Sequence, residues 1–116
     1  MSPKPPHLRR GEAAESHALA WLERRGLKAV ARNYRCRGGE IDLIVQDGPT
    51  LVFVEVRYRS RNDYGGAAES VDRRKRQRLQ RAAEHYLQRL ERIPPCRFDI
   101  IGIDADERID WIRNAF

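Results

Sequence analysis

The chain of 116 residues lacks most of the features that mark a secreted, membrane-spanning or disulfide-rich protein. Its two cysteines, Cys36 and Cys96, are too few for a disulfide framework, and its three histidines have no metal-ligand spacing. No apolar run approaches the roughly 20 residues of a membrane span, and no apolar stretch near the start resembles a secretory signal. These absences predict a cytoplasmic protein with one globular domain and no membrane partner.

Lysine is scarce as well, because arginine supplies 20 of the 23 basic residues. Residues 1–37 carry nine basic and three acidic side chains, residues 57–92 carry eleven and five, and each stretch therefore has a balance of +6. Between them lies an acidic island, residues 38–56, with four acids and no base. Basic surfaces attract polyanions and the arginine fork binds phosphate, so this pattern favours nucleic acid as a partner. A GC-rich genome is an alternative explanation of the arginine excess, but it explains the acidic island less well.

The hydrophobic periodicity predicts an α/β fold in which a mixed β-sheet is flanked by helices, in the order α-β-β-β-α-β-β. Apolar residues at three- and four-residue spacing indicate the helices, with Ser70 as the N-cap of the second, and alternating apolar residues indicate the strands. We expect a disordered basic arm over 1–10 and a single domain over 11–116. The helices are predicted at 11–25 and about 70–91, and the strands at 28–35, about 40–46, about 51–58, 96–103 and 107–112.

Two consecutive predicted strands place charged residues on one face and apolar residues on the other, because side chains alternate along a strand. The charged face holds Glu40 and Asp42 of the first strand and Glu55 and Arg57 of the second. The opposite, apolar face of the first strand is predicted to hold Ile41, Leu43 and Val45. The acids lie towards the centre of the charged face and the arginines at its rim.

A tight turn between these strands makes paired residue numbers sum to 97, which places Asp42 opposite Glu55 and Glu40 opposite Arg57. Directly opposed side chains have Cβ atoms roughly 4.5–5.5 Å apart, so the two acids repel unless they share a proton, splay into water or bind a cation. Mg²⁺ typically takes one or two carboxylates together with waters and phosphate oxygens, which fits this pair. The alternative is the solvated outer face of an edge hairpin, where alternating charges are ordinary.

A third acid, Glu12, begins the first predicted helix and is a candidate to join the pair. Glu15 lies one turn later and can point the same way. The alternative for Glu12 is a structural role, because acids are common in the first turn of a helix, where they face the positive end of its dipole.

Basic residues follow the second strand in the loop from 57 to 66, where arginine alternates with tyrosine. Arginine can hold phosphates and tyrosine can stack on bases, so Arg59 and Arg61 are candidates for nucleic-acid contact. The next helix begins with a cationic run that adds Arg73, Arg74 and Lys75 to these candidates. Lys75 shares a helix face with apolar residues, so we expect it at the edge of the core. The alternative for the run is a solvated helix face.

With these residues in view, the chain resembles the YraN-like family of small bacterial proteins from Arg10 to Phe116. Several short motifs and single residues carry the resemblance. They are Gly11-Glu12, Asn33-Tyr34-Arg35, Gly39-Glu40-Ile41-Asp42-Leu43-Ile44, Phe53-Val54-Glu55-Val56-Arg57, Lys75, Arg97-Phe98-Asp99 and Asn114-Ala115-Phe116.

That family is similar to the restriction-endonuclease superfamily, near the archaeal Holliday-junction resolvases. The resemblance implies a mixed sheet flanked by helices, with Asp42 as the first acid, Glu55 as the second and Glu12 as the helix glutamate. It also implies Mg²⁺ or Mn²⁺ as cofactor, held by these acids. Arg57 stands where the superfamily signature has lysine. An arginine cannot act as a base, but it can stabilise charge on a phosphate.

The leading hypothesis is a metal-dependent DNA endonuclease-like protein, with branched or structured DNA as the substrate class. Glu40 would orient Arg57, and Arg35, Arg59, Arg61 and Lys75 would grip flanking phosphates. One alternative is a non-catalytic nucleic-acid-binding module with a nuclease fold, and another is a protein-interaction domain. Resolvases act as dimers, so a homodimer is an expectation by analogy.

Overall fold

The secondary structure follows the predicted order and confirms the α/β fold class. The computed structural model describes residues 6–58 and 70–116, with side chains described from residue 11 onward. Its elements are α1 (Pro6–Glu23), β1 (Lys28–Cys36), β2 (Gly39–Asp47), β3 (Thr50–Tyr58), α2 (Arg73–Leu87), β4 (Cys96–Ile103) and β5 (Ile109–Ile112). Neither of the described helices is long and apolar enough to cross a membrane.

The strands form one mixed sheet in the order β1-β2-β3-β4-β5. All neighbouring strands are antiparallel except β3 and β4, which are parallel and are connected through α2. Because β2 and β3 each have a neighbour on both sides, they are central strands. This position excludes the alternative of an exposed edge hairpin for the acidic strands.

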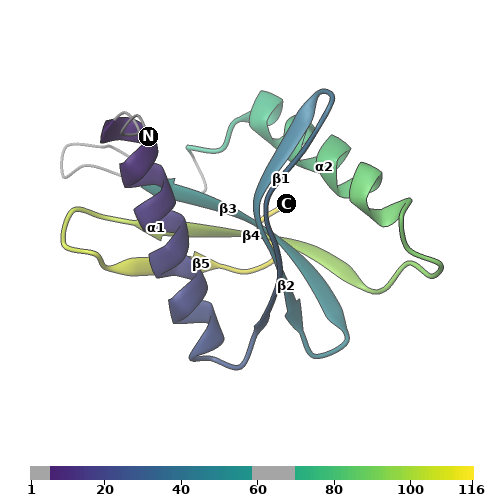
Figure 1. Cartoon of the computed structure of the whole chain (residues 1–116), viewed down its shortest axis with the longest axis horizontal. Coiled ribbons are helices and arrows are strands. Elements are labelled where there is room, and N and C mark those ends of the chain that lie inside the picture. The colour runs from purple at the N-terminus through teal and green to yellow at the C-terminus, as the bar shows by residue number, and fades with distance from the viewer. Residues whose placement is uncertain (1–5, 59–69) are drawn as a thin grey trace, which may run out of the picture.

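Each face of the sheet is covered by one helix, as Figure 1 shows. The predicted apolar stripe of each helix packs against the sheet and is therefore buried. We call these two contacts the α1 interface and the α2 interface. The α1 interface contains Ala14, Ala18, Leu22, Leu43, Val45, Val52, Val54, Ile101 and Ile103. The α2 interface contains Ile41, Ile44, Leu51, Phe53, Val71, Leu79, Ala82, Ala83 and Ile100.

The helix boundaries differ from the prediction in three places. α1 begins at Pro6 rather than 11, and the first five residues of the predicted arm lie outside the described residues. The N-cap of α2 is Asp72 and not Ser70, because the Asp72 carboxylate accepts the backbone N–H of Lys75 at 2.9 Å. α2 ends at Leu87 rather than 91, before the double proline.

The predicted register of β2 and β3 is confirmed. Their paired residues run from Asp47 and Thr50 to Leu43 and Val54, and every pair sums to 97. The turn between the strands holds Gly48 at φ 57°, a left-handed conformation that glycine adopts without strain. The ladder stops at the pair of Leu43 and Val54, so the two strands separate where the acids begin.

Beyond this point β2 continues with β1 as a hairpin whose tip rests on α2 (Figure 1). A Cβ atom added to Gly39 would lie against the carbonyl oxygen of Arg78 and 2.9 Å from the backbone nitrogen of Ala82. The bend puts Ile41 into the α2 interface, whereas Leu43 stays in the α1 interface. The predicted sharing of one face by Ile41, Leu43 and Val45 is therefore wrong, because β2 does not alternate regularly through Asp42.

A buried acid, Asp99, ties β4 to β5 and to the C-terminus. Asp99 is 1% exposed, and its carboxylate accepts hydrogen bonds from the side chains of Arg97 and Trp111 and from the backbone N–H of Asn114, at 2.9 to 3.2 Å. Arg97 also forms an ion pair with Asp47 at 2.9 Å. The motifs Arg97-Phe98-Asp99 and Asn114-Ala115-Phe116 thus meet around one carboxylate.

Candidate functional site

The acids Asp42 and Glu55 lie where β2 and β3 separate, directly after the last pair of their ladder. The backbone N–H of Val56 donates to Oδ2 of Asp42 at 2.8 Å, which holds this carboxylate against β3. The Glu55 side chain is 14% exposed and lies on the face covered by α2. The sheet therefore brings the two predicted acids together and withdraws them from water.

Both acids have raised pKa values, as expected for two carboxyl groups in one poorly solvated place. Burial, followed by the charge of Asp42, raises the pKa of Glu55 to about 8, and the nearby Arg57 and Lys75 offset part of this rise. Burial also raises the pKa of Asp42, although hydrogen bonds from Val56 and Glu55 favour its charged form. The pair therefore retains a proton near neutral pH, shared through the hydrogen bond between Glu55 and Asp42.

The helix α1 brings Glu15 towards this pair. Burial raises the pKa of Glu15 to about 7, and the charge of Asp42 is the second cause. With its amide nitrogen facing the helix, Asn33 donates to both carboxylate oxygens of Glu15 at 3.0 and 3.1 Å. Glu12 is exposed on the same helix, one turn earlier. Glu15 is thus an α1 acid whose pKa is raised by the charge of Asp42. A role of Glu12 as a metal ligand stays a prediction.

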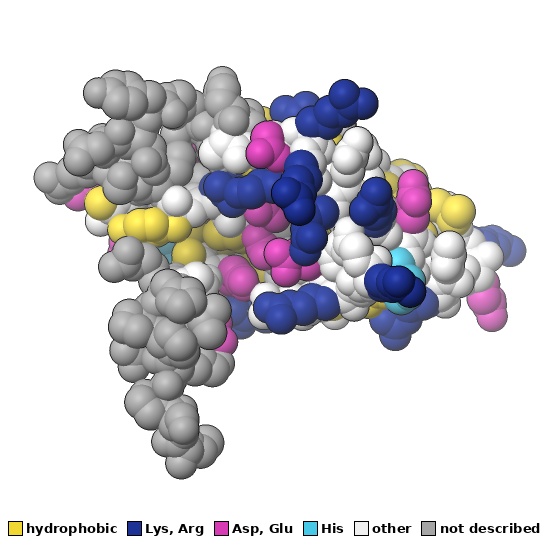
Figure 2. Space-filling view, turned by 90° about the horizontal axis from the view of Figure 1, so that it is seen from above, with side chains coloured by type: hydrophobic (Ala, Val, Ile, Leu, Met, Phe, Trp, Pro, Cys, Tyr) yellow, Lys and Arg dark blue, Asp and Glu magenta, His cyan; other side chains and the backbone are white. Residues whose placement is uncertain are grey.

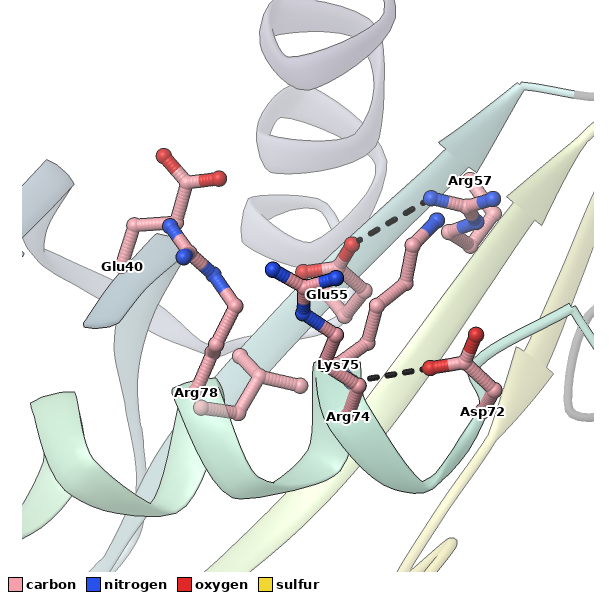
Figure 3. Close-up of a pocket in the computed structure, with 8 residues that line it drawn as sticks. Glu40, Glu55, Arg57, Asp72, Arg74, Lys75 and Arg78 are labelled. Carbon is pink, nitrogen blue, oxygen red and sulfur yellow. Dashed lines mark hydrogen bonds and ion pairs between the residues drawn. The ribbon is translucent and has the colours of Figure 1, made fainter. Parts of the chain in front are cut away.

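Two cations stand beside Glu55, as Figure 3 shows. Nη1 of Arg57 lies 3.7 Å from Oε1 of Glu55, and Nε of Arg57 donates to Oγ of Ser70 at 3.1 Å. Lys75 extends from the first turn of α2 and is half-buried, which confirms its predicted place at the edge of the core. Glu55 is therefore flanked by cations from two different elements.

Glu55 lines a cleft of about 470 Å³ between β3 and the start of α2. Figure 2 shows acidic side chains in the middle of this face with Lys and Arg side chains around them. The cleft is lined by Glu40, Glu55, Arg57, Asp72, Arg74, Lys75, Arg78 and Leu79. An acidic floor with a basic rim suits a phosphate group that approaches a cation.

Glu40 does not face Arg57 as predicted. It pairs with Arg35 across β1 and β2, and Nε of Arg35 lies 3.8 Å from Oε2 of Glu40. Figure 3 shows Glu40 and Arg57 towards opposite ends of the cleft. The predicted pairing required the β2–β3 ladder to continue past Asp42, and the strands have separated by then.

The predicted nucleic-acid residues fall into three groups. Arg74 and Lys75 line the cleft, Arg73 and Arg35 are exposed near it, and Arg59 and Arg61 lie outside the described residues. Three contributors were missing from the predicted site, namely Arg78, Ser70 and Asn33. Helical periodicity would have found Arg78, which lies three residues after Lys75, but no local pattern marks Ser70 or Asn33.

The described residues fit a divalent cation held by two carboxylates. Within residues 6–58 and 70–116, no three acidic, histidine or cysteine side chains form a ligand group. The adjacent acids Asp42 and Glu55 match the one or two carboxylates that Mg²⁺ takes when waters and phosphate oxygens complete its shell. Their raised pKa values show that the charged forms of both acids are unfavourable here, and a bound cation would stabilise these charged forms.

The fold and the site define a small α/β protein with a buried acid pair under a basic-rimmed cleft. Comparison with known sequences then identifies the family. The model of "Uncharacterised protein family UPF0102" matches residues 14–103. The chain belongs to this family, which confirms the resemblance inferred from the motifs.

Three relatives show how far the similarity extends. A UPF0102 protein of Cupriavidus metallidurans is 56% identical over 109 residues, which cover 93% of this chain and 81% of the relative. A relative in Aeromonas hydrophila is 54% identical over 110 residues, covering 92% and 84%. A relative in Pseudomonas fluorescens is 49% identical over 113 residues, covering 95% and 94%. The similarity thus covers more than nine tenths of this chain in each case.

Proposed function

We propose that this protein is a metal-dependent DNA endonuclease-like protein that acts on branched or structured DNA. The observation that carries the proposal is the pair Asp42 and Glu55, two adjacent acids with raised pKa values, of which Glu55 lines the basic-rimmed cleft. A cation relieves such a pair, and a basic rim attracts the phosphates of a nucleic acid. The net charge of +6 favours the same partner.

In this proposal Asp42 and Glu55 hold Mg²⁺ or Mn²⁺, together with the backbone carbonyl of Val56. A bound metal ion polarises a phosphate and lowers the pKa of a coordinated water. Waters and phosphate oxygens would complete this shell, and Glu12 of α1 is the predicted third protein ligand. Asp42 keeps its orientation through the N–H of Val56, so the site is built before a cation arrives.

In the proposed reaction, cationic side chains stabilise negative charge and position the DNA. Arg57 places positive charge next to Glu55, where charge develops on a phosphate during hydrolysis. Arg74 and Arg78 at the rim of the cleft, with Arg35 and Arg73 nearby, would position the flanking phosphates. Contacts of this kind give salt-dependent affinity without sequence preference.

A second candidate function is nucleic-acid binding without cleavage. It is favoured by Arg57, which occupies the signature lysine position and is held between Glu55 and Ser70. Arginine cannot lose its proton, so it cannot activate water as a base. The basic rim would bind DNA equally well in this case.

Cleavage of duplex, single-stranded and four-way-junction DNA in Mg²⁺ and in Mn²⁺ tests the proposal. We expect cleavage by the wild-type protein, with the four-way junction as the preferred substrate, and its loss in Asp42→Ala and Glu55→Ala. Asp110→Ala, which removes an exposed acid of β5, is the matched control and should cleave normally. Binding without cleavage in either metal would support the second candidate, and cleavage unaffected by Asp42→Ala and Glu55→Ala would remove the proposed site.

A further inference from the structure

Arg57 is tied into the fold by contacts on two sides. Its Nη1 lies 3.7 Å from the Glu55 carboxylate and its Nε donates to Ser70, and the side chain is 27% exposed. These contacts link β3 to the segment that leads into α2. A guanidinium held in this way has little freedom to follow a reacting phosphate, and it cannot give up its proton.

Lys75 lines the same cleft as Glu55 and extends into it from the first turn of α2. Its backbone N–H is capped by Asp72 at 2.9 Å, which fixes the first turn of α2 and therefore the origin of the side chain. The half-buried side chain runs along the cleft, and Figure 3 shows its ammonium group beside Glu55 and Arg57. Its charge lowers the pKa of Glu55, which places it within electrostatic reach of that acid.

The identity of this residue also matters. Lysine occurs at only three positions in the chain, Lys4, Lys28 and Lys75, against 20 arginines. The residues on both sides of Lys75 in the helix are arginines, so the cationic run alone did not need a lysine. An ammonium group is a compact point charge with three rotatable donors, whereas a guanidinium is a planar fork with fixed donor directions. The ammonium group is therefore the better fit for a reacting water and a phosphate oxygen together.

We propose that Lys75, rather than Arg57, is the catalytic cation of the cleft, and that it donates hydrogen bonds to the attacking water and to an oxygen of the scissile phosphate. This inference rests on the proposed function. In the hydrolysis, the water oxygen forms a bond to phosphorus while the bond from phosphorus to one deoxyribose oxygen breaks. One proton of the water passes to solvent, and the departing oxygen takes a proton from solvent. Lys75 stays protonated and stabilises the negative charge on the phosphate.

The test separates the rate of cleavage from the affinity for DNA. The rate is measured in single turnovers at saturating four-way-junction DNA with Mg²⁺ across a range of pH, and the Kd is measured with Ca²⁺ in place of Mg²⁺. We expect Lys75→Met to lower the saturating rate by about 100-fold or more while the Kd changes by less than about threefold. Lys75→Arg, which keeps the charge but not the compact ammonium, should recover only part of the rate. Arg57→Met should lower the saturating rate less than Lys75→Met does.

Two controls exclude a structural explanation. Lys28→Met removes an exposed lysine at the far end of β1 and should leave the saturating rate unchanged. Aminoethylation of a Lys75→Cys variant restores a lysine-like side chain and should restore the rate and its pH profile. Because Cys36 and Cys96 are free cysteines, aminoethylated wild-type protein is measured alongside.

The outcomes distinguish this inference from the proposed function. Cleavage by the wild type together with a saturating rate within about threefold of it in Lys75→Met would overturn the role of Lys75 and leave the proposed function in place. A failure of aminoethylation to restore the rate would also overturn it. No cleavage by the wild type with Mg²⁺ or Mn²⁺ would overturn both.

Discussion

Two places in this sheet hold buried acids, and they are built in opposite ways. Asp99 on β4 is 1% exposed and its carboxylate accepts hydrogen bonds from Arg97, Trp111 and Asn114. Asp42 and Glu55, on β2 and β3, have each other as neighbours, and burial raises the pKa of both. One carboxylate is satisfied by the fold, whereas the two acids of the pair would repel each other if both lost their protons.

This difference separates an acid that stabilises the structure from acids that are available for function. A buried charge with a full set of donors is ordinary in a folded core. Two desolvated acids side by side reduce stability unless another species binds them, and such groups gather at functional sites. Arg57 and Lys75 offset part of the repulsion without removing it, because the pKa of Glu55 stays at about 8.

Removal of Asp99, the acid with a full set of hydrogen-bond donors, should cause the largest loss of stability. Asp99→Ala leaves the half-buried Arg97 without its main partner, and we expect a loss of about 3–5 kcal/mol in the free energy of unfolding. Urea denaturation measures this loss. Asp110→Ala, at an exposed acid of the neighbouring strand, should change the free energy by less than about 0.5 kcal/mol. A similarly small effect at Asp99 would show that its network contributes nothing to stability.

The second-largest loss of stability is expected where the tip of the β1–β2 hairpin packs on α2. Gly39→Ala forces a Cβ atom against the backbone of Arg78 and Ala82, and we expect a loss of about 1–3 kcal/mol by urea denaturation. The same hairpin positions β2 beside the acid pair, so the variant should also weaken binding of a divalent cation. Gly11→Ala is the matched control, because nothing lies within 4 Å of an added Cβ there and alanine favours a helix. Equal stability of the two variants would contradict the close packing of Gly39.

The acid pair should make stability depend on pH in a characteristic direction. The pKa of Glu55 is about 8 in the folded protein against an ordinary value of 4.5, so the folded state binds more protons between these pH values. Stability should therefore fall as pH rises from about 5 to 8, because the folded state loses the proton that Glu55 holds, and Glu15 should add to the fall. Glu55→Gln should flatten most of this dependence in urea denaturation at several pH values. An unchanged pH dependence in Glu55→Gln would place the titrating group elsewhere.

The smallest effect is expected at the anchor of Arg57. Ser70→Ala removes the hydroxyl that accepts from Nε of Arg57, and we expect a loss of about 0.5–1.5 kcal/mol in thermal unfolding. Freed from this contact, Arg57 should interact more closely with Glu55, so the stability at pH 8 should fall less than the stability at pH 5. An equal loss at both pH values would show that Ser70 does not influence the acid pair.

Most of the fold could be predicted because the patterns that specify it are local. The apolar stripes of both helices, the alternating strands and the tight turn after Asp47 each depend on residues close in the sequence. That turn also determined the register, which is why Asp42 and Glu55 could be paired in advance. The alternation of β2 failed at Asp42, where β2 has left β3 and its tip packs closely on α2.

The rest of the site could not be predicted because it depends on contacts between distant segments. Arg35 pairs with Glu40 only after β1 and β2 have formed a hairpin beyond the end of the β2–β3 ladder. Ser70 meets Arg57, and Asn33 meets Glu15, across elements that no local pattern connects. Whether Glu12 or Glu15 points towards Asp42 depends on how α1 is rotated about its axis on the sheet. Helical spacing alone does not determine this rotation.

Whether Asp42 and Glu55 form a cation site is tested by the thermal stability of the protein at pH 8 during a titration with Mn²⁺. We expect a rise in Tm that saturates, corresponding to a stabilisation of about 2.7 kcal/mol when Mn²⁺ is about 100 times its Kd. Asp42→Asn and Glu55→Gln should abolish the rise, and Asp110→Asn should retain it. A wild-type Tm that Mn²⁺ does not change, or an equal rise in Glu55→Gln, would contradict the claim.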